Sequence, residues 1–220
     1  IVNPTANELD IKNRTLAKMA GSVAIAGAAA WTSAKIGWAP SIMTMIIAAV
    51  ALVIVNAVMM ARVSTMRTLT AYIILALESA VMGYILSSIF YKYSKTAILV
   101  SFIVTALYFS ALCIIGMVTK KDMTRLDHIA TIGIIVLIIT ELIMVFINAP
   151  VIWMILSAVT IVLFSITTVS DAQRMDRLVD DGSARSENMS TILALSMMLD
   201  FINIMLSVLQ LISGYSRSND

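Results

Sequence analysis

Hydrophobic residues fill seven long stretches of the 220-residue chain, and short polar connections separate them. A membrane-spanning helix needs about 20 mainly apolar residues at about 1.5 Å of rise each, and every stretch comes close to that length. The predicted spans are Ala17–Ile36, Ile42–Ala61, Leu69–Ile89, Thr96–Val118, Ile129–Ile147, Val151–Asp171 and Thr191–Ser213. Backbone polar groups in lipid must be paired within the chain. The pattern therefore predicts an all-α integral membrane protein with seven transmembrane helices.

Composition supports this prediction and narrows the domain organisation. The chain is 60% hydrophobic and 13% charged, whereas a soluble domain has roughly 25% charged residues. No polar block between the spans is long enough to fold by itself, so we expect a single membrane domain over residues 1–220. The net charge of +2 is scattered over short loops, which argues against a nucleic-acid partner and indicates that the lipid bilayer is the main one.

The distribution of Lys and Arg predicts how the chain crosses the membrane. Eleven of these residues fall in the N-terminal segment and in the loops on the same side, and four fall on the opposite side. Loops rich in Lys and Arg remain in the cytoplasm. We therefore expect a cytoplasmic N-terminus and, after seven spans, a C-terminus outside.

Four carboxylates lie where a bilayer should reject them: Glu78, Glu141, Asp171 and Asp200. A carboxylate at the centre of a membrane helix costs about 3 kcal/mol, so it normally faces the bundle interior or a water-filled cavity. Glu78 precedes Ser79, Gly83 and Ser87, whose spacing of four residues is typical of a close-packing face.

Polar residues of the last span recur at steps of three and four, which places them along one seam of a helix: Ser196, Asp200, Asn203, Ser207, Gln210 and Gly214. The sixth span has a weaker seam of Ser157, Thr160, Thr168 and Asp171. Two such seams facing each other would line a polar core. Hydroxyl and amide groups also hold helices together without any transport role, and that interpretation stays open for them.

Three stretches resemble motifs of the Bax-inhibitor (transmembrane Bax inhibitor motif) family. Residues 194–205, Ala-Leu-Ser-Met-Met-Leu-Asp-Phe-Ile-Asn-Ile-Met, closely resemble its final-helix signature. Residues 116–123, Gly-Met-Val-Thr-Lys-Lys-Asp-Met, are similar to its Gly-x-x-Thr-Lys-x-Asp-Leu turn after the fourth span. Residues 171–175, Asp-Ala-Gln-Arg-Met, are similar to its Asp-x-x-x-Ile stretch at the end of the sixth. Ser170 stands where the family often has an aromatic residue.

The resemblance implies a fold in which six helices surround the last one, and a pH-sensitive calcium leak. In bacterial members two aspartates, which match Asp171 and Asp200, share a proton and are latched by an arginine at the cytoplasmic end of the second helix. That arginine corresponds to Arg62, with Arg67 as the neighbouring alternative. Ser196, Asn203, Ser207 and Glu78 are candidates to line or support the path. Calcium prefers oxygen ligands, so we expect weak contacts to Asp171 and Asp200.

Other functions stay open to different degrees. An intramembrane aspartyl protease would need Tyr-Asp and Gly-x-Gly-Asp motifs, but the contexts here are Ser170-Asp171 and Leu199-Asp200. We therefore expect no enzyme activity and no cofactor, with calcium ions and protons as the transported or sensed species. A proton-coupled cation exchanger and a non-conducting membrane interaction protein remain alternatives. The resemblance is to short bacterial members, which favours a bacterial inner membrane.

Overall fold

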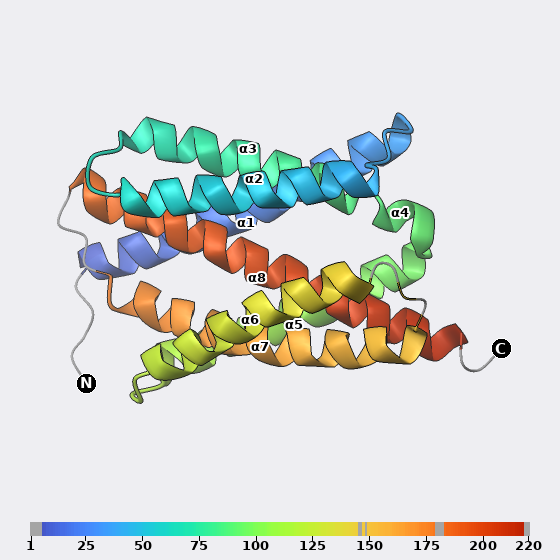
Figure 1. The fold of residues 1–220 in the computed structure, drawn as a ribbon. Coiled ribbons are helices and arrows are strands. Elements are labelled where there is room, and N and C mark those ends of the chain that lie inside the picture. Colours follow the sequence, from blue (N-terminus) through green and yellow to red (C-terminus); the bar gives the residue numbers. More distant parts are fainter. Residues whose placement is uncertain (1–5, 145–146, 148, 179–182, 218–220) are drawn as a thin grey trace. The chain divides into compact units, whose positions relative to one another are not determined.

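The computed structural model describes residues 6–144, 147, 149–178 and 183–217, which form helices and short connections with no strand among them (Figure 1). The helices are α1 (Ala6–Lys35), α2 (Ile42–Ala61), α3 (Thr68–Leu86), α4 (Ile89–Lys92), α5 (Lys95–Val118), α6 (Thr124–Met144), α7 (Pro150–Asp176) and α8 (Ala184–Arg217). The predicted all-α fold is confirmed.

Six helical segments of the described chain are long and apolar enough to cross a membrane: Ile42–Ala61, Thr68–Lys92, Lys95–Val118, Thr124–Met144, Val151–Asp176 and Ala184–Gly214. They match the last six predicted spans. Residues 145 and 146, near the end of the predicted fifth span, lie outside the described residues. The first predicted span lies within α1, which is not among the six, because its many alanines and glycines add less hydropathy than Leu or Ile.

Side-chain caps mark where two helices begin, and a glycine turn follows the end of α1. Ser41 and Ser94 accept hydrogen bonds from the backbone N–H groups of Thr44 (3.2 Å) and Ala97 (3.1 Å), which caps α2 and α5. Gly37, in the turn after α1, has a φ of 75°, a conformation that costs glycine little. These local signals separate the predicted spans.

Helix α8 is the most buried of the six candidate spans. Inside the structure, 72% of its most apolar window is buried, whereas the other five windows are 11% to 39% buried. Its burial includes apolar positions such as Leu195, Met197 and Met198, each 0% exposed. This burial agrees with the expectation that the last helix is the central one.

The described chain forms two compact units that share α8. Unit 1 comprises Ile1–Lys92 and Met175–Met198, and unit 2 comprises Tyr93–Arg174 and Leu199–Asp220. The predicted single domain stays a prediction.

In unit 1, α1 packs closely against α3, and α2 contacts α3 as well (Figure 1). A Cβ atom at Gly83 would lie 2.2 Å from the Ala26 carbonyl oxygen and 2.7 Å from the Cβ of Ala29. Ser79 and Ser87 are also buried. The predicted close-packing face of the third span is therefore confirmed, with α1 as its partner.

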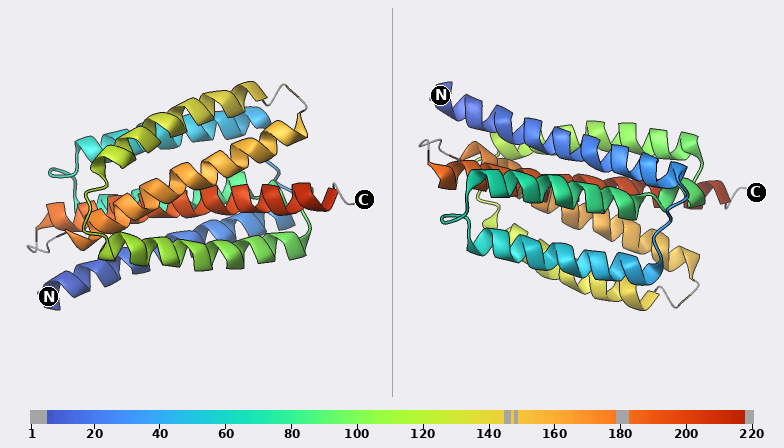
Figure 2. Two further views of the ribbon diagram at one scale, coloured as in Figure 1. Left: turned by 90° about the horizontal axis from the view of Figure 1, so that it is seen from below. Right: turned by 90° about the horizontal axis from the view of Figure 1, so that it is seen from above.

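In unit 2, α5 and α7 run along the C-terminal half of α8 (Figure 2). The Phe201 ring of α8 packs edge-on against Phe102 and Phe109 of α5, with centroids 5.6 and 5.5 Å apart. On α7, the Ser157 hydroxyl donates to Gln210 of α8 at 2.5 Å. Rings and polar groups thus hold the segment that begins at Leu199 between two neighbours.

Candidate functional site

Asp171 on α7 and Asp200 on α8 belong to the same unit, and both are almost completely buried. Their residues are 3% and 4% exposed, respectively. Asp171 lies one helical turn after Thr167 and Thr168 on α7, and the hydroxyls of these threonines contact the Asp200 carboxyl group. The structure thus brings together the two aspartates that the sequence singled out.

Asp200 is held by two threonines of α7. The hydroxyls of Thr167 and Thr168 lie 3.1 and 3.2 Å from its Oδ2 atom. Each hydroxyl also lies within hydrogen-bond distance of the Phe164 carbonyl oxygen, at 3.0 and 2.7 Å. A hydroxyl has one hydrogen to donate and lone pairs to accept. Both hydroxyls can donate to an ionised Asp200, and when Asp200 is protonated one of them can accept its single hydrogen while donating to Phe164, so the site suits both proton states.

Asp171 is bound by Arg174, which also binds Asp127. The Arg174 guanidinium donates from Nη1 to Asp171 at 3.2 Å and from Nη2 to Asp127 at 2.5 Å. The side chains of the two aspartates are 4% and 8% exposed, whereas that of Arg174 is 48% exposed. One arginine thus joins α6 to α7 beside the aspartate pair.

The sequence pattern does not predict this bridge. Arg174 stands out only as a charge after the sixth predicted span, and Asp127 does not stand out at all. One signal was present, because Asp171 and Arg174 are three residues apart and side chains at that spacing share a helix face. Nothing comparable pointed to Asp127, which comes from a separate helix.

Two of the family-like motifs pack against each other around this bridge. A Cβ atom at Gly116 of α5 would lie 2.5 Å from the Val169 carbonyl oxygen and 2.6 Å from the Cβ of Ala172. One residue further, the Gln173 amide donates to the carbonyl oxygens of Thr119 (2.8 Å) and Lys121 (2.9 Å). Its Oε1 atom accepts from the Met123 N–H at 3.2 Å. Residues 116–123 therefore fix the end of α7 that bears Asp171 and Arg174.

Some side chains in the polar seam of α8 donate hydrogen bonds to backbone carbonyls of the same helix. Asn203 donates to the Leu199 carbonyl at 2.9 Å, and Ser207 donates to the Asn203 carbonyl at the same distance. Ser207 is buried, and Asn203 and Ser196 are partly exposed. The predicted lining role of these residues is compatible with this placement and stays a prediction.

Arg62, Glu78 and Ser196 lie in unit 1, whereas both aspartates lie in unit 2. Arg62 is exposed at the C-terminal cap of α2. Glu78 is 4% exposed and accepts from the Asn56 amide at 3.1 Å through Oε2. The latch by Arg62, or by Arg67 in the same turn, stays a prediction.

Metal-binding side chains do not cluster in the described part of the chain, where no three His, Cys, Asp or Glu residues gather closely enough to hold an ion. The predicted calcium contacts of Asp171 and Asp200 stay a prediction.

Comparison with known proteins places these residues in a family context. The family model described as "Inhibitor of apoptosis-promoting Bax1" matches residues 10–218. An uncharacterized membrane protein of Streptococcus pyogenes serotype M6 is 31% identical over 139 residues, which cover 63% of this chain and 61% of that protein. The chain thus matches less than two thirds of that relative's length.

Two further relatives are covered more fully. A Borreliella burgdorferi protein is 30% identical over 154 residues, 69% of this chain and 66% of its own. The inner membrane protein YbhL of Escherichia coli K12 is 29% identical over 171 residues, 76% of this chain and 72% of YbhL.

Proposed function

Because this chain belongs to the Bax-inhibitor family, we propose that it is a pH-sensitive calcium leak channel of a bacterial inner membrane. One observation carries the proposal. Asp171 and Asp200 come from two separate family-like motifs, yet both are buried in one unit, and the threonines that bind Asp200 lie one helical turn from Asp171. Buried ionisable groups within membrane helices normally belong to ion or proton pathways.

The gate in this proposal is the number of protons on the aspartate pair. Two carboxylates that interact in a low dielectric ionise in two separate steps, so the pair holds a single proton over part of the pH range. Each proton state favours a different packing of α7 against α8, because charge on the pair changes which groups must stay close. A conformational equilibrium with a small free-energy gap then follows pH.

Two arginines have separate roles in this proposal. Arg174 is hydrogen-bonded to Asp171, and an adjacent guanidinium favours a charged carboxylate. Arg62 is the predicted latch that releases when the pair gains a proton, with Arg67 as the alternative. The two arginines differ in role, since Arg174 is on the same helix as Asp171 and Arg62 comes from the end of α2.

Calcium is the proposed cargo, and the chain acts on it without enzyme chemistry or a cofactor. Carboxylate, hydroxyl and amide oxygens are the ligands that calcium prefers. Asp171 and Asp200 supply carboxylates, and Ser196, Asn203, Ser207 and Glu78 supply further oxygens along the proposed path. In this proposal the contacts with calcium are weak, which suits passage.

The test is calcium flux into dye-loaded proteoliposomes between about pH 6 and pH 8. We expect the native protein to give a pH-dependent flux. Asp171→Asn and Asp200→Asn should each reduce the flux difference across this range at least about twofold, because one member of the pair no longer ionises. Glu141→Gln, which removes another membrane-embedded carboxylate, is the matched control and should keep the native profile.

Two further measurements define the outcome. Arg62→Ala should shift the pH profile of the flux, and Arg67→Ala should leave the profile in place. The reverse result would assign the latch to Arg67.

Flux from folded native protein that is no greater than flux from empty liposomes at every pH would refute the channel and favour the interaction protein. Saturable flux that requires a proton gradient would favour the exchanger.

A further inference from the structure

We infer that Asn188 is a positioning residue that fixes the α2–α3 turn, and with it Arg62, to helix α8. The inference rests on the proposed function only for the role of Arg62 as a latch. The clamp itself is a set of contacts within unit 1. It links the turn to the same helix that bears Asp200, about three helical turns further along.

The contacts of Asn188 account for both hydrogens of its side-chain amide. Its Nδ2 atom donates to the carbonyl oxygen of Val63 at 3.0 Å and to that of Met66 at 2.8 Å. Asn188 is 0% exposed. Only the NH₂ group of the amide can face two carbonyl oxygens, so the orientation of the side chain follows from its partners.

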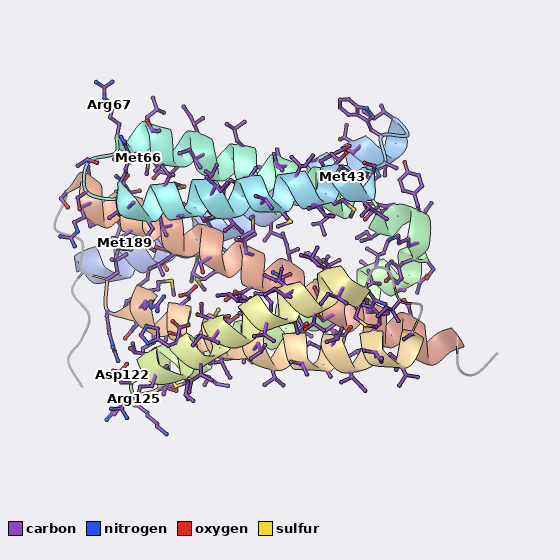
Figure 3. All side chains as sticks on the ribbon, viewed as in Figure 1. Met43, Met66, Arg67, Asp122, Arg125 and Met189 are labelled. Atoms are coloured by element: carbon purple, nitrogen blue, oxygen red, sulfur yellow. The ribbon has the colours of Figure 1, made fainter. Side chains whose placement is uncertain are left out.

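The turn needs such a donor because the Val63 and Met66 carbonyls lie after the end of α2, and a backbone carbonyl outside a helix must find its hydrogen-bond partner elsewhere. Helix α2 ends at Ala61, and the Arg62 carbonyl accepts from the N–H groups of Thr65 (3.0 Å) and Met66 (2.9 Å). The turn therefore folds around Arg62, while Asn188 supplies the donors for Val63 and Met66. In Figure 3, Met66 in the turn and Met189, the residue after Asn188, lie at the same end of unit 1.

Charged groups around Asn188 anchor the start of α8 to the rest of unit 1. Glu187 accepts from Lys18 at 2.7 Å and Arg14 at 3.1 Å, both on α1. It also accepts from the Tyr72 hydroxyl on α3. Glu187, the residue before Asn188, binds α8 to α1 and α3. Asn188 is therefore held in place relative to these helices. A displacement of this part of α8 therefore carries the turn with it.

The first experiment needs no transport. Trypsin cleaves after arginine, and Arg62 and Arg67 are both exposed in the turn. In detergent-solubilised protein, Asn188→Leu should speed cleavage after these two arginines about tenfold, because two hydrogen bonds no longer keep the turn closed. Ser22→Ala removes a buried polar group of α1 that does not touch the turn and should leave that rate unchanged. Equal rates in native protein and Asn188→Leu would overturn the clamp.

The second experiment tests positioning through the pH profile of calcium flux. Asn188→Leu should shift the profile in the same direction as Arg62→Ala, and Asn188→Gln, which keeps the amide donors, should restore most of the native profile. An unshifted profile in Asn188→Leu, alongside a shifted one in Arg62→Ala, would overturn the positioning role and leave the proposed function intact. Absence of native flux would refute the proposed function, while the trypsin result would still decide the clamp.

Discussion

Arg174 is the residue on which two buried carboxylates of unit 2 converge. Its guanidinium reaches Asp171 on its own helix and Asp127 on α6, while almost half of its side chain stays exposed. Burying a carboxylate that has no cationic partner costs free energy, because the charge loses its hydration. Arg174 therefore supplies a cationic hydrogen-bond donor to both buried aspartates.

Replacing Arg174 should destabilise the protein and couple to Asp127. We expect Arg174→Gln to lower the free energy of unfolding by about 1–2 kcal/mol, a modest value because the guanidinium is partly exposed. The Arg174→Gln/Asp127→Asn double variant should lose less than the two single variants combined, with a coupling of about 1 kcal/mol. Denaturant unfolding in detergent micelles gives these values.

Arg125→Gln is the matched control for this cycle. Arg125 begins the same helix as Asp127 and is exposed (Figure 3), so its replacement should change the unfolding free energy by less than about 0.5 kcal/mol. Strict additivity of the Arg174 and Asp127 substitutions would contradict an energetically significant bridge.

At the scale of helices, glycine sets how closely two backbones approach. Gly83 lets α3 lie against α1, and Gly116 lets α5 lie against α7 beside Asp171. Inside a membrane the hydrophobic effect does not drive helices together. Small residues let the backbones approach closely, and the resulting van der Waals packing stabilises the contact. The two contacts thus position one close-packing face in each unit.

Gly83→Ala should be clearly destabilising although alanine favours helices. Its Cβ atom would meet the Ala26 backbone carbonyl, which cannot move as a side chain can, so we expect a loss of about 1–3 kcal/mol. Gly27→Ala is the control on α1, because no atom lies within 4 Å of the added Cβ, and it should be neutral or stabilise by up to about 1 kcal/mol. Thermal unfolding in detergent compares the two; similar melting temperatures would contradict the close contact.

At the scale of the whole molecule, the number of crossings decides where the C-terminus lies. Among the described residues, six helical segments have the length and hydropathy needed to span a membrane, and α1, which contains the first predicted span, is not one of them. Lys12 pairs with Asp176 at the end of α7, and Arg14 and Lys18 pair with Glu187 in the first turn of α8. Lys12 and Arg14 precede the predicted span Ala17–Ile36, so the polar start of α1 extends beyond that span.

Reporter fusions test the predicted topology. A fusion at Asp220 should give active alkaline phosphatase and non-fluorescent GFP, because seven crossings from a cytoplasmic N-terminus end outside. A fusion at Lys121 should give fluorescent GFP, and one at Ser94 active phosphatase. Fluorescent GFP at Asp220, with the other two fusions as expected, would mean that the last segment does not cross. Reversal at all three positions would mean that the orientation is inverted.

The sequence by itself determined the helices and much of the candidate site. Helix boundaries follow from runs of apolar residues and from local caps such as Ser41 and Ser94, which depend on neighbours only a few residues away. Asp171 and Asp200 stood out because a bilayer rejects carboxylates, and their motifs pointed to the family that the comparison then confirmed.

Only the tertiary structure decided which polar groups meet. The bridge from Arg174 to Asp127 and the clamp from Asn188 to the α2–α3 turn join residues far apart in the chain. Helical periodicity tells which face of a helix is polar but not which helix lies opposite it. The partner is chosen when all helices pack together, because each buried donor and acceptor must then find a match among the groups that packing brings near.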